Sequence, residues 1–351
     1  MIKASAPAKV IVYGEHAVVH DRLGVSAAVG PNRTYVKISQ GDRDNVSIES
    51  IDLDLRESRN KKSVHELIAE LDKLRKEERY ESIKTVAKAD RLAPSFVVAG
   101  KTMECFRTYE PVKIDIRCKV PKNLGSSSSV FSSIAFGLSR YLDKDPPLED
   151  MGDLANEGDN VAHGKASGID AKTVTRGYWN TYKKSEGIKG LNVDFEGPLV
   201  IVESGESART GETVTYLNEL LNRRPNLVNP MLNRLEGITF RGLDALKSQD
   251  LEAIGKAMTD YAYELRKVDG MNAEGLKKVI FSTPKLEQII DIALNSKALG
   301  AKPTGGWGGG CCIVLPKDNY QAEDLVEVFQ NRGFNSFQAK LGVEGVKEEF
   351  L

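Results

Sequence analysis

The sequence predicts an α+β protein with two lobes. At 351 residues the chain exceeds the usual size of a single hydrophobic core. Short strand-like runs dominate its beginning, whereas helical periodicity dominates beyond residue 197. Helix and strand patterns then alternate over 284–339, which is typical of a sheet backed by helices on one face. We place the lobes at 1–190 and 191–351.

The first lobe begins as sheet. β-branched runs at 9–13, 34–38 and 46–51 predict strands, and alternation at 112–120 predicts another. Apolar residues at helical spacing predict helices over 63–77 and 96–106, which would cover one face of that sheet. A serine run at 126–129 opens the next helix, and helix 148–162 follows it.

The second lobe is predicted to be richer in helix. A strand at 199–203 leads into helices at 212–222, 228–247 and 250–266, with proline and glycine residues between them. The chain ends with helix 284–297, strand 311–315, helix 321–331 and a strand at 336–339.

Composition favours a small-molecule partner. The net charge of −1 gives no overall basicity that would attract nucleic acid or a membrane surface. The four cysteines lack metal-ligand spacing, which argues against a zinc site or a disulfide framework and suits a reducing cytosol. No segment approaches the roughly 18 uninterrupted apolar residues of a membrane span, and the N-terminus has no apolar signal core. We expect a cytoplasmic protein.

Residues 112–129 have the pattern of a strand, a glycine turn and a helix start, which suits a phosphate group. The first N–H groups of a helix and its dipole favour an anion. Gly125 would let the backbone approach a ligand closely. Serine hydroxyls can bind Mg²⁺, and we assign Ser127 to the metal. The competing interpretation is a helix that its serines simply cap.

Two carboxylates complete the predicted site. Asp159 falls on the apolar stripe of helix 148–162, whereas Glu157 falls on the solvent side. A buried carboxylate needs a partner, so Asp159 is the predicted Mg²⁺ ligand, with a structural hydrogen bond as the alternative. Asp170 lies on a predicted turn, where aspartate often caps the backbone. If Lys9 lies beside it, Asp170 could instead accept a hydroxyl proton during phosphoryl transfer from ATP.

Segment 304–310 contains too many glycines for a simple hairpin. We expect its backbone to pack closely against a ligand or a neighbouring segment, with a flexible loop as the alternative. A ring as large as that of Trp307 must fill a pocket there or close over a ligand.

These segments resemble the GHMP kinase superfamily and, within it, the mevalonate kinase family. Residues 5–20, SAPAKVIVYGEHAVVH, resemble the first family motif most closely. The serine run resembles the ATP-binding motif, residues 163–170 resemble the segment of the catalytic aspartate, and 304–311 resemble the glycine-rich third motif. The resemblance extends over essentially the whole chain.

The resemblance implies a ribosomal-protein-S5-like N-terminal lobe, a ferredoxin-like C-terminal lobe and a site between them. It implies phosphorylation of the C5 hydroxyl of mevalonate with ATP and Mg²⁺, and homodimers are common among such proteins. The implied residues are Asp170 as base with Lys9 as its partner; Ser127 and Asp159 for Mg²⁺; Asn123, Leu124, Gly125, Ser126, Ser127 and Ser128 for ATP; and Glu15, His16, Thr210 and Gly305 for the substrate. We add Lys165 to the predicted substrate residues, although the family pattern does not supply it.

The chain departs from the family pattern at four places. Its second motif is two positions shorter and has Asn123 where a glycine is expected, Trp307 replaces a glycine, and Asp159 replaces a glutamate. Lys165 stands where Asn-Pro or Thr-Pro is usual, and with Arg209 it could hold a phosphate on the acceptor. The alternatives are therefore a kinase of a phosphorylated mevalonate, either phosphomevalonate kinase or mevalonate-3-phosphate 5-kinase, and a non-catalytic GHMP-fold regulator.

Overall fold

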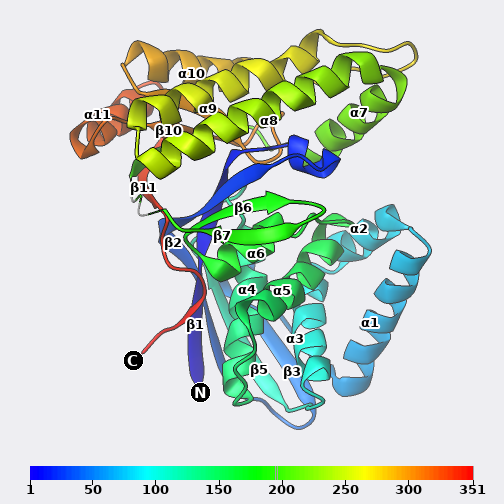
Figure 1. Ribbon diagram of the computed structural model, residues 1–351. Coiled ribbons are helices and arrows are strands. Elements are labelled where there is room, and N and C mark those ends of the chain that lie inside the picture. The colour runs from blue at the N-terminus through cyan, green and yellow to red at the C-terminus, as the bar shows by residue number, and fades with distance from the viewer. Residues whose placement is uncertain (194, 196, 351) are drawn as a thin grey trace.

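A computed structural model describes residues 1–193, 195 and 197–350, and its strands join into one sheet that crosses both halves of the chain (Figure 1). The main strand order is β4-β3-β5-β2-β11-β8-β10-β9. The 17-residue β2 (Gly24–Gln40) connects the halves, because it pairs with strands of both. The other strands on this path are β3 (Asn45–Ser50), β4 (Leu55–Asn60), β5 (Val112–Cys118), β8 (Pro198–Glu203), β9 (Gly300–Thr304), β10 (Cys311–Leu315) and β11 (Asn335–Leu341).

Among the described residues, four further strand pairings branch from this path. β1 (Ile2–Tyr13) runs antiparallel to β2 and also pairs with β12 (Lys347–Glu348). β6 (Trp179–Lys183) pairs with β2 and with β7 (Gly187–Leu191).

The helices of the first half pack on its strands and on one another. They are α1 (Lys61–Lys76), α2 (Tyr80–Ala89), α3 (Ala93–Cys105), α4 (Ser126–Tyr141), α5 (Leu148–His163) and α6 (Ile169–Arg176). Their apolar faces and the strands form one core, to which α3 contributes Phe96 and Val98 and α4 contributes Ile134 and Leu138.

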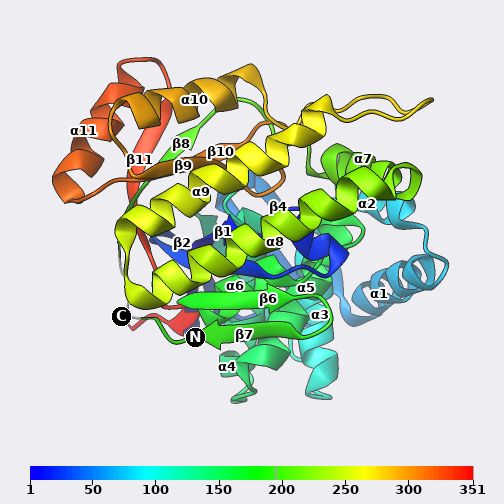
Figure 2. The same ribbon diagram turned by 45° about the horizontal axis from the view of Figure 1, so that its top comes forward.

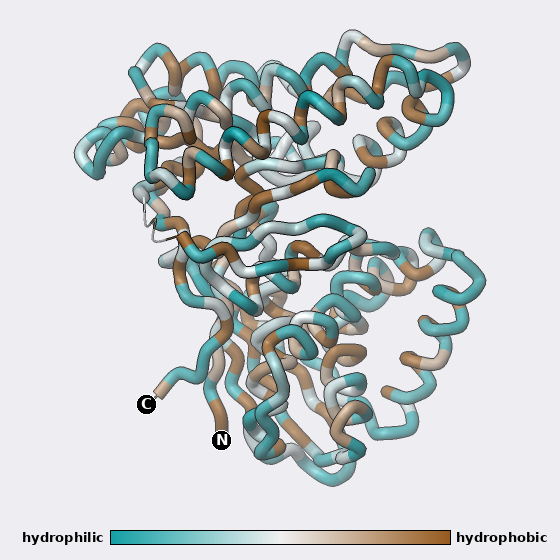
Figure 3. The backbone as a smooth tube through the Cα atoms, viewed as in Figure 1, coloured by the Kyte–Doolittle hydropathy of each residue, from teal (hydrophilic) through white to brown (hydrophobic). Residues whose placement is uncertain are grey.

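The second half carries long helices; the last three of them contact β8, β9 or β10, whereas the first two pack on each other and the second of these packs on the third (Figure 2). These helices are α7 (Thr210–Arg223), α8 (Pro225–Ser248), α9 (Leu251–Leu265), α10 (Pro284–Asn295) and α11 (Asn319–Gln330). Apolar residues concentrate along the central strands, while the outer helices alternate between apolar and polar residues (Figure 3). Within the described residues, no helix has both the length and the apolar character needed to cross a bilayer.

The end of the chain returns to the first half. Ser5 Oγ donates a hydrogen bond to Glu349 Oε1 at 2.6 Å, and Arg33 Nη1 donates to the carbonyl oxygen of Glu344 at 3.0 Å. Both chain ends consequently lie near each other in Figure 1. The boundary between residues 190 and 191 stays a prediction.

The predicted helices and strands are present with shifted ends, but several elements were missed. The missed helices and strands are α2, α6, β4, β6, β7, β9 and β12. The prediction that Asp170 lies on a turn is wrong, because Gly168, with φ of 85°, begins helix α6 and places Asp170 in its first turn. The capping role of the serines is also wrong, because the N-cap of α4 is Gly125 and no side chain caps it.

Helix α9 contacts β9 through two glycines. A Cβ atom built on Gly255 would lie 2.4 Å from the backbone of Leu299, and one built on Gly300 would lie 1.9 Å from the carbonyl oxygen of Gly255. Backbone atoms cannot turn aside as a flexible side chain can, so this contact requires glycine.

We expect Gly255→Ala to lower the free energy of unfolding by about 2–3 kcal/mol, because it overpacks this contact. The matched control is Gly237→Ala in α8, where an added Cβ meets nothing within 4 Å. That change should raise the free energy of unfolding by up to about 1 kcal/mol, since alanine favours helix. Urea denaturation of both variants measures these changes. Equal changes in the free energy of unfolding would contradict the close contact between α9 and β9 at Gly255.

Candidate active site

Lys9 and Asp170 form an ion pair where β1 meets the first turn of α6. The distance from Lys9 Nζ to Asp170 Oδ1 is 2.8 Å. Lys9 is buried, whereas 40% of the Asp170 side chain is exposed. The carboxylate is therefore held by a fixed cation on one side and open to an incoming group on the other.

Gly125 brings the start of α4 against Lys9. Its φ is 77°, a left-handed conformation, and a Cβ there would lie 2.8 Å from Cγ of Lys9. The amide of Lys9 donates to the carbonyl oxygen of Leu124 at 2.9 Å. Because the first N–H groups of a helix lack intrahelical acceptors, this contact sets the positive end of α4 beside the ion pair.

The serine hydroxyls of α4 bind Asp159 of α5. Ser127 Oγ donates to Asp159 Oδ1 at 2.9 Å, and Ser128 Oγ donates to Asp159 Oδ2 at 2.5 Å. Asp159 is buried, as its position on the apolar stripe predicts. Glu157 is half-buried and pairs with Arg75 of α1 at 2.9 Å, so it points away from the serines.

Burial raises the pKa of Asp159 to about 6, and the charge of Asp170 adds to this, while His163 and the two serine hydroxyls oppose it. A cation beside Asp159 would offset the burial of its charge. Hydroxyl and carboxylate oxygens suit Mg²⁺, which commonly binds one or two carboxylates together with substrate phosphates. Among the described residues, no group of three or more His, Cys, Asp or Glu forms a separate metal cage.

The shortened turn before α4 lies against the glycine-rich segment. Asn123 has a φ of 68°, a conformation that asparagine tolerates better than most residues. Its carbonyl oxygen lies 3.6 Å from the position of a Cβ on Gly305, and its Cγ lies equally far from one on Gly310. The altered second motif thus keeps its place beside the third.

The glycines of 305–310 allow close packing on residues 206–210. A Cβ on Gly306 would lie 1.7 Å from Oγ1 of Thr210. The amide of Gly310 donates to the carbonyl oxygen of Glu206 at 2.8 Å, and the amide of Arg209 donates to that of Trp307 at 3.0 Å. Of the two neighbours expected for the glycine-rich segment, a ligand or another segment, the structure shows the segment 206–210. This contact places Thr210 against the glycine turn.

Trp307 fills the interior of the second half. Its side chain has no exposed surface and belongs to the same core as Phe281. The amide of Gly308 donates to the carbonyl oxygen of Phe281 at 2.8 Å, which fixes the turn around the ring. Of the two predicted alternatives, the pocket-filling one is correct.

Glu15 and His16 are buried behind the ion pair. The Glu15 carboxylate accepts a hydrogen bond from Lys302 Nζ, and neither side chain is exposed. The His16 ring lies 4.9 Å from that of Phe281, and burial lowers the pKa of His16 to about 3. Lys302 was missed from the sequence, because a lysine in a short segment before proline gives no signal of burial.

Lys165 is exposed, and its Nζ lies 5.2 Å from the ring centroid of Tyr80. The side chain is thus held on α2 by a cation–π contact. The neighbouring His163 is also exposed, and its Nε2 lies 3.4 Å from Ser127 Oγ.

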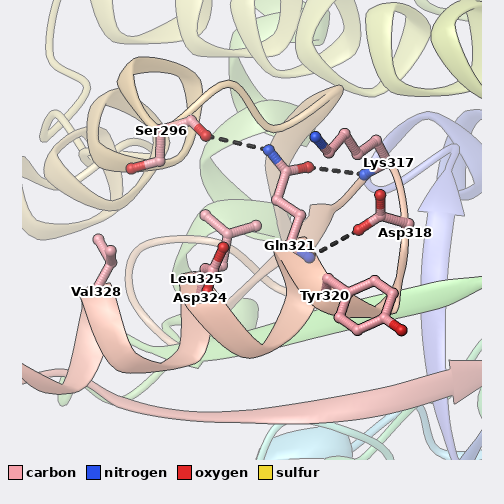
Figure 4. A pocket seen from close by; sticks show the side chains of 8 residues that line it. All are labelled: Ser296, Lys317, Asp318, Tyr320, Gln321, Asp324, Leu325 and Val328. Atoms are coloured by element: carbon pink, nitrogen blue, oxygen red, sulfur yellow. Dashed lines mark hydrogen bonds between the residues drawn. The ribbon is translucent and has the colours of Figure 1, made fainter.

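A cavity of about 270 Å³ lies apart from these residues, beside α11 (Figure 4). Gln321 crosses it, accepting from the amide of Lys317 at 2.8 Å and donating to the carbonyl oxygen of Ser296 at 3.2 Å. These hydrogen bonds connect the end of α10 with the start of α11. The polar groups that line the cavity therefore have a structural role.

Two models of protein families match the chain, one in each half. Residues 95–177 match the family model "GHMP kinases N terminal domain", and residues 243–335 match "GHMP kinases C terminal". The chain belongs to the GHMP kinase superfamily. The fold and the family predicted from the sequence are therefore confirmed.

Relatives extend over the whole chain. The mevalonate kinase of Pyrococcus abyssi is 28% identical over 352 residues, covering 99% of this chain and 98% of that protein. The crystal structure of Methanococcus jannaschii mevalonate kinase superposes with a TM-score of 0.78 at 22% identity, covering 97% of this chain and 98% of that one. A Streptococcus pneumoniae phosphomevalonate kinase complex gives 0.70 at 17% identity, with 97% and 100% covered. At such identities the two structures establish the fold and leave the acceptor open.

The pKa of Asp159 predicts a pH-dependent cost in stability. Its folded value of about 6 exceeds the ordinary 3.8, so the folded state binds more protons than the unfolded state between about pH 4 and 6. The contribution of Asp159 to stability therefore falls as pH rises through this window. We expect Asp159→Asn to raise the free energy of unfolding by about 2 kcal/mol at pH 7.5 and by much less at pH 4.

Urea denaturation at both pH values checks this. Asp153→Asn on the same helix is the control, because 59% of the Asp153 side chain is exposed. If Asp159→Asn raised the free energy of unfolding equally at pH 4 and pH 7.5, the charge of Asp159 would not be the cause of the lost stability.

Proposed function

We propose that the chain is an ATP-dependent kinase that phosphorylates the C5 hydroxyl of mevalonate in isoprenoid precursor synthesis. The observation that carries the proposal is the Lys9–Asp170 ion pair at 2.8 Å, placed beside the start of α4. Relatives named mevalonate kinase that match over nearly the full length support this acceptor.

Asp170 is the base in this proposal. Its partly exposed carboxylate accepts the proton of the C5 hydroxyl as the oxygen attacks the γ-phosphorus of ATP. Lys9 orients the carboxylate and offsets the negative charge that develops on the transferred group. A positioned base of this kind contributes about 10²–10⁴-fold to the rate.

The helix start and the serine–aspartate cluster bind the nucleotide. The backbone of 123–128 and the positive end of α4 hold the phosphates of ATP. Ser127 and Asp159 would hold Mg²⁺, which would supply charge neutralisation on the phosphate oxygens. Asp159 has one methylene less than a glutamate, and hydrogen bonds from the Ser127 and Ser128 hydroxyls fix the orientation of its carboxylate.

The acceptor lies toward the second half of the chain. Neutral His16 and the glycine turn at Gly305, with Thr210 packed on it, line this side, and Glu15 lies behind them. A neutral imidazole can accept a hydrogen bond from a hydroxyl as well as donate one, which suits an alcohol acceptor.

Replacing Asp170 tests the base. We expect Asp170→Asn to lower kcat by at least about 100-fold, because an amide cannot accept the proton. Folding and the KM for ATP should change little. Steady-state kinetics with mevalonate is the measurement, and Asp153→Asn is the control for removing an aspartate charge. A kcat near that of the wild type would refute the assignment, and absence of turnover in the wild type itself would favour a non-catalytic regulator.

Lys165→Ala tests the choice of acceptor. Because Lys165 is held on Tyr80, we expect its loss to change the KM for mevalonate by less than about twofold, as for a weak exposed contact. The KM values for mevalonate and for its 3- and 5-phosphates are compared. A large rise confined to a phosphorylated acceptor would instead support a kinase of phosphorylated mevalonate.

A further inference from the structure

Lys302 is a fully buried cation that no step of the proposed reaction uses. Its Nζ donates to the carbonyl oxygens of Pro303 at 2.7 Å and Ile11 at 3.4 Å, and to Glu15 Oε1. Three acceptors match the three N–H donors of an ammonium group, whereas a neutral amine has two. The geometry therefore describes a protonated Lys302 paired with an ionised Glu15.

Glu15 stands between two lysines. It faces Lys302 on β9 and is also within the electrostatic range of Lys9 on β1, which in turn pairs with Asp170. The charge alternates in sign along the series Lys302, Glu15, Lys9 and Asp170. This series begins in the buried interior of the second half and ends at the partly exposed carboxylate of Asp170. The other groups that face this pair are the hydroxyls of Tyr13 and Tyr261, the thiol of Cys312 and the ring of His16.

β9 also holds the backbone of β1 near Lys9. Thr304 Oγ1 donates to the carbonyl oxygen of Ile11 at 3.0 Å and accepts from its amide at 3.1 Å. The register between β1 and β2 shifts between Ile11 and Tyr13, so regular sheet pairing is interrupted at this point. Lys302 thus contacts both Ile11 and Glu15, which enclose the irregular part of β1 just after Lys9.

We propose that Lys302 is a positioning residue for phosphoryl transfer, which fixes the end of β1 through Glu15 and Ile11 and thereby sets the Lys9–Asp170 contact. The inference rests on the proposed function for its kinetic test, but its structural test is independent of the acceptor. The competing role is purely structural, with Lys302 doing no more than neutralise a buried carboxylate.

The two roles separate because a buried ion pair can often be replaced by neutral groups without loss of stability. Lys302→Met alone leaves Glu15 buried without its cation, and this variant can fail to fold for that reason alone. The double variant Glu15→Gln with Lys302→Met removes both charges and keeps similar volumes. It should therefore unfold at a urea concentration no lower than the wild type.

Kinetics of these variants distinguish the positioning role from the purely structural one, because only the positioning role predicts a loss of kcat in both. Lys302→Met should lower kcat at least tenfold at pH 7, with the KM for ATP changed less than twofold. Burial raises the pKa of Glu15 and Lys302 opposes this, so without Lys302 the carboxyl takes up a proton. Ionising Glu15 again at higher pH does not restore the contacts that Lys302 makes to Glu15 and Ile11, so the loss of kcat should persist as pH rises. The double variant should keep the tenfold loss at every pH, because it has no carboxyl to titrate.

Lys256→Met on α9 is the matched control, since 75% of the Lys256 side chain is exposed. Its kcat and its unfolding midpoint should equal those of the wild type. A double variant with wild-type kcat would overturn the positioning role. A kcat of Lys302→Met that returns to the wild-type value at high pH would also overturn it, because the charge of Glu15 alone would then be sufficient.

A crystal structure of the double variant distinguishes this proposal from the proposed function. We expect the Lys9 Nζ–Asp170 Oδ1 contact of 2.8 Å to be lost. If it is lost while the wild type phosphorylates no mevalonate, the proposed function fails and the positioning role stands. If the contact is unchanged, the positioning role fails whatever the turnover.

Discussion

The ion pair between Lys9 and Asp170 is the interaction on which the rest of the site depends. The lysine comes from an early buried strand and the aspartate from a short helix far along the chain, so only the folded sheet brings them together. Gly125 leaves room for the lysine side chain, and Gly168 begins the helix that carries the aspartate. Both glycines have positive φ, so an alanine at either position would strain the backbone next to the pair.

Charge is buried on both sides of this pair. On one side Asp159 is held by two serine hydroxyls, and on the other Glu15 is paired with Lys302. Buried charges are costly unless they are paired or bind a cation, and the raised pKa of Asp159 reflects that cost. The protein therefore gives up stability at Asp159 to keep a carboxylate at the start of α4, where we propose that Mg²⁺ binds.

The sequence predicted much of this site because the local patterns were informative. Periodicity placed Asp159 on the inner face of its helix, and the strand, glycine turn and serines located the start of α4, whose binding of phosphate stays a prediction. Helix α6 was missed because eight residues between two glycines give too little periodicity, and β9 was missed because it contains Gly300 and Pro303. Lys302 could not be predicted, because its burial depends on Glu15, 287 residues away in sequence.

The account as a whole depends on the chemical identity of the product. The most direct measurement is a phosphorus and carbon NMR analysis of the product formed from mevalonate, ATP and Mg²⁺ by the wild-type chain. The account predicts a single phosphomonoester on the C5 oxygen, formed with one ADP per acceptor. Phosphorylation at another oxygen, or turnover only when the acceptor already carries a phosphate, would contradict it.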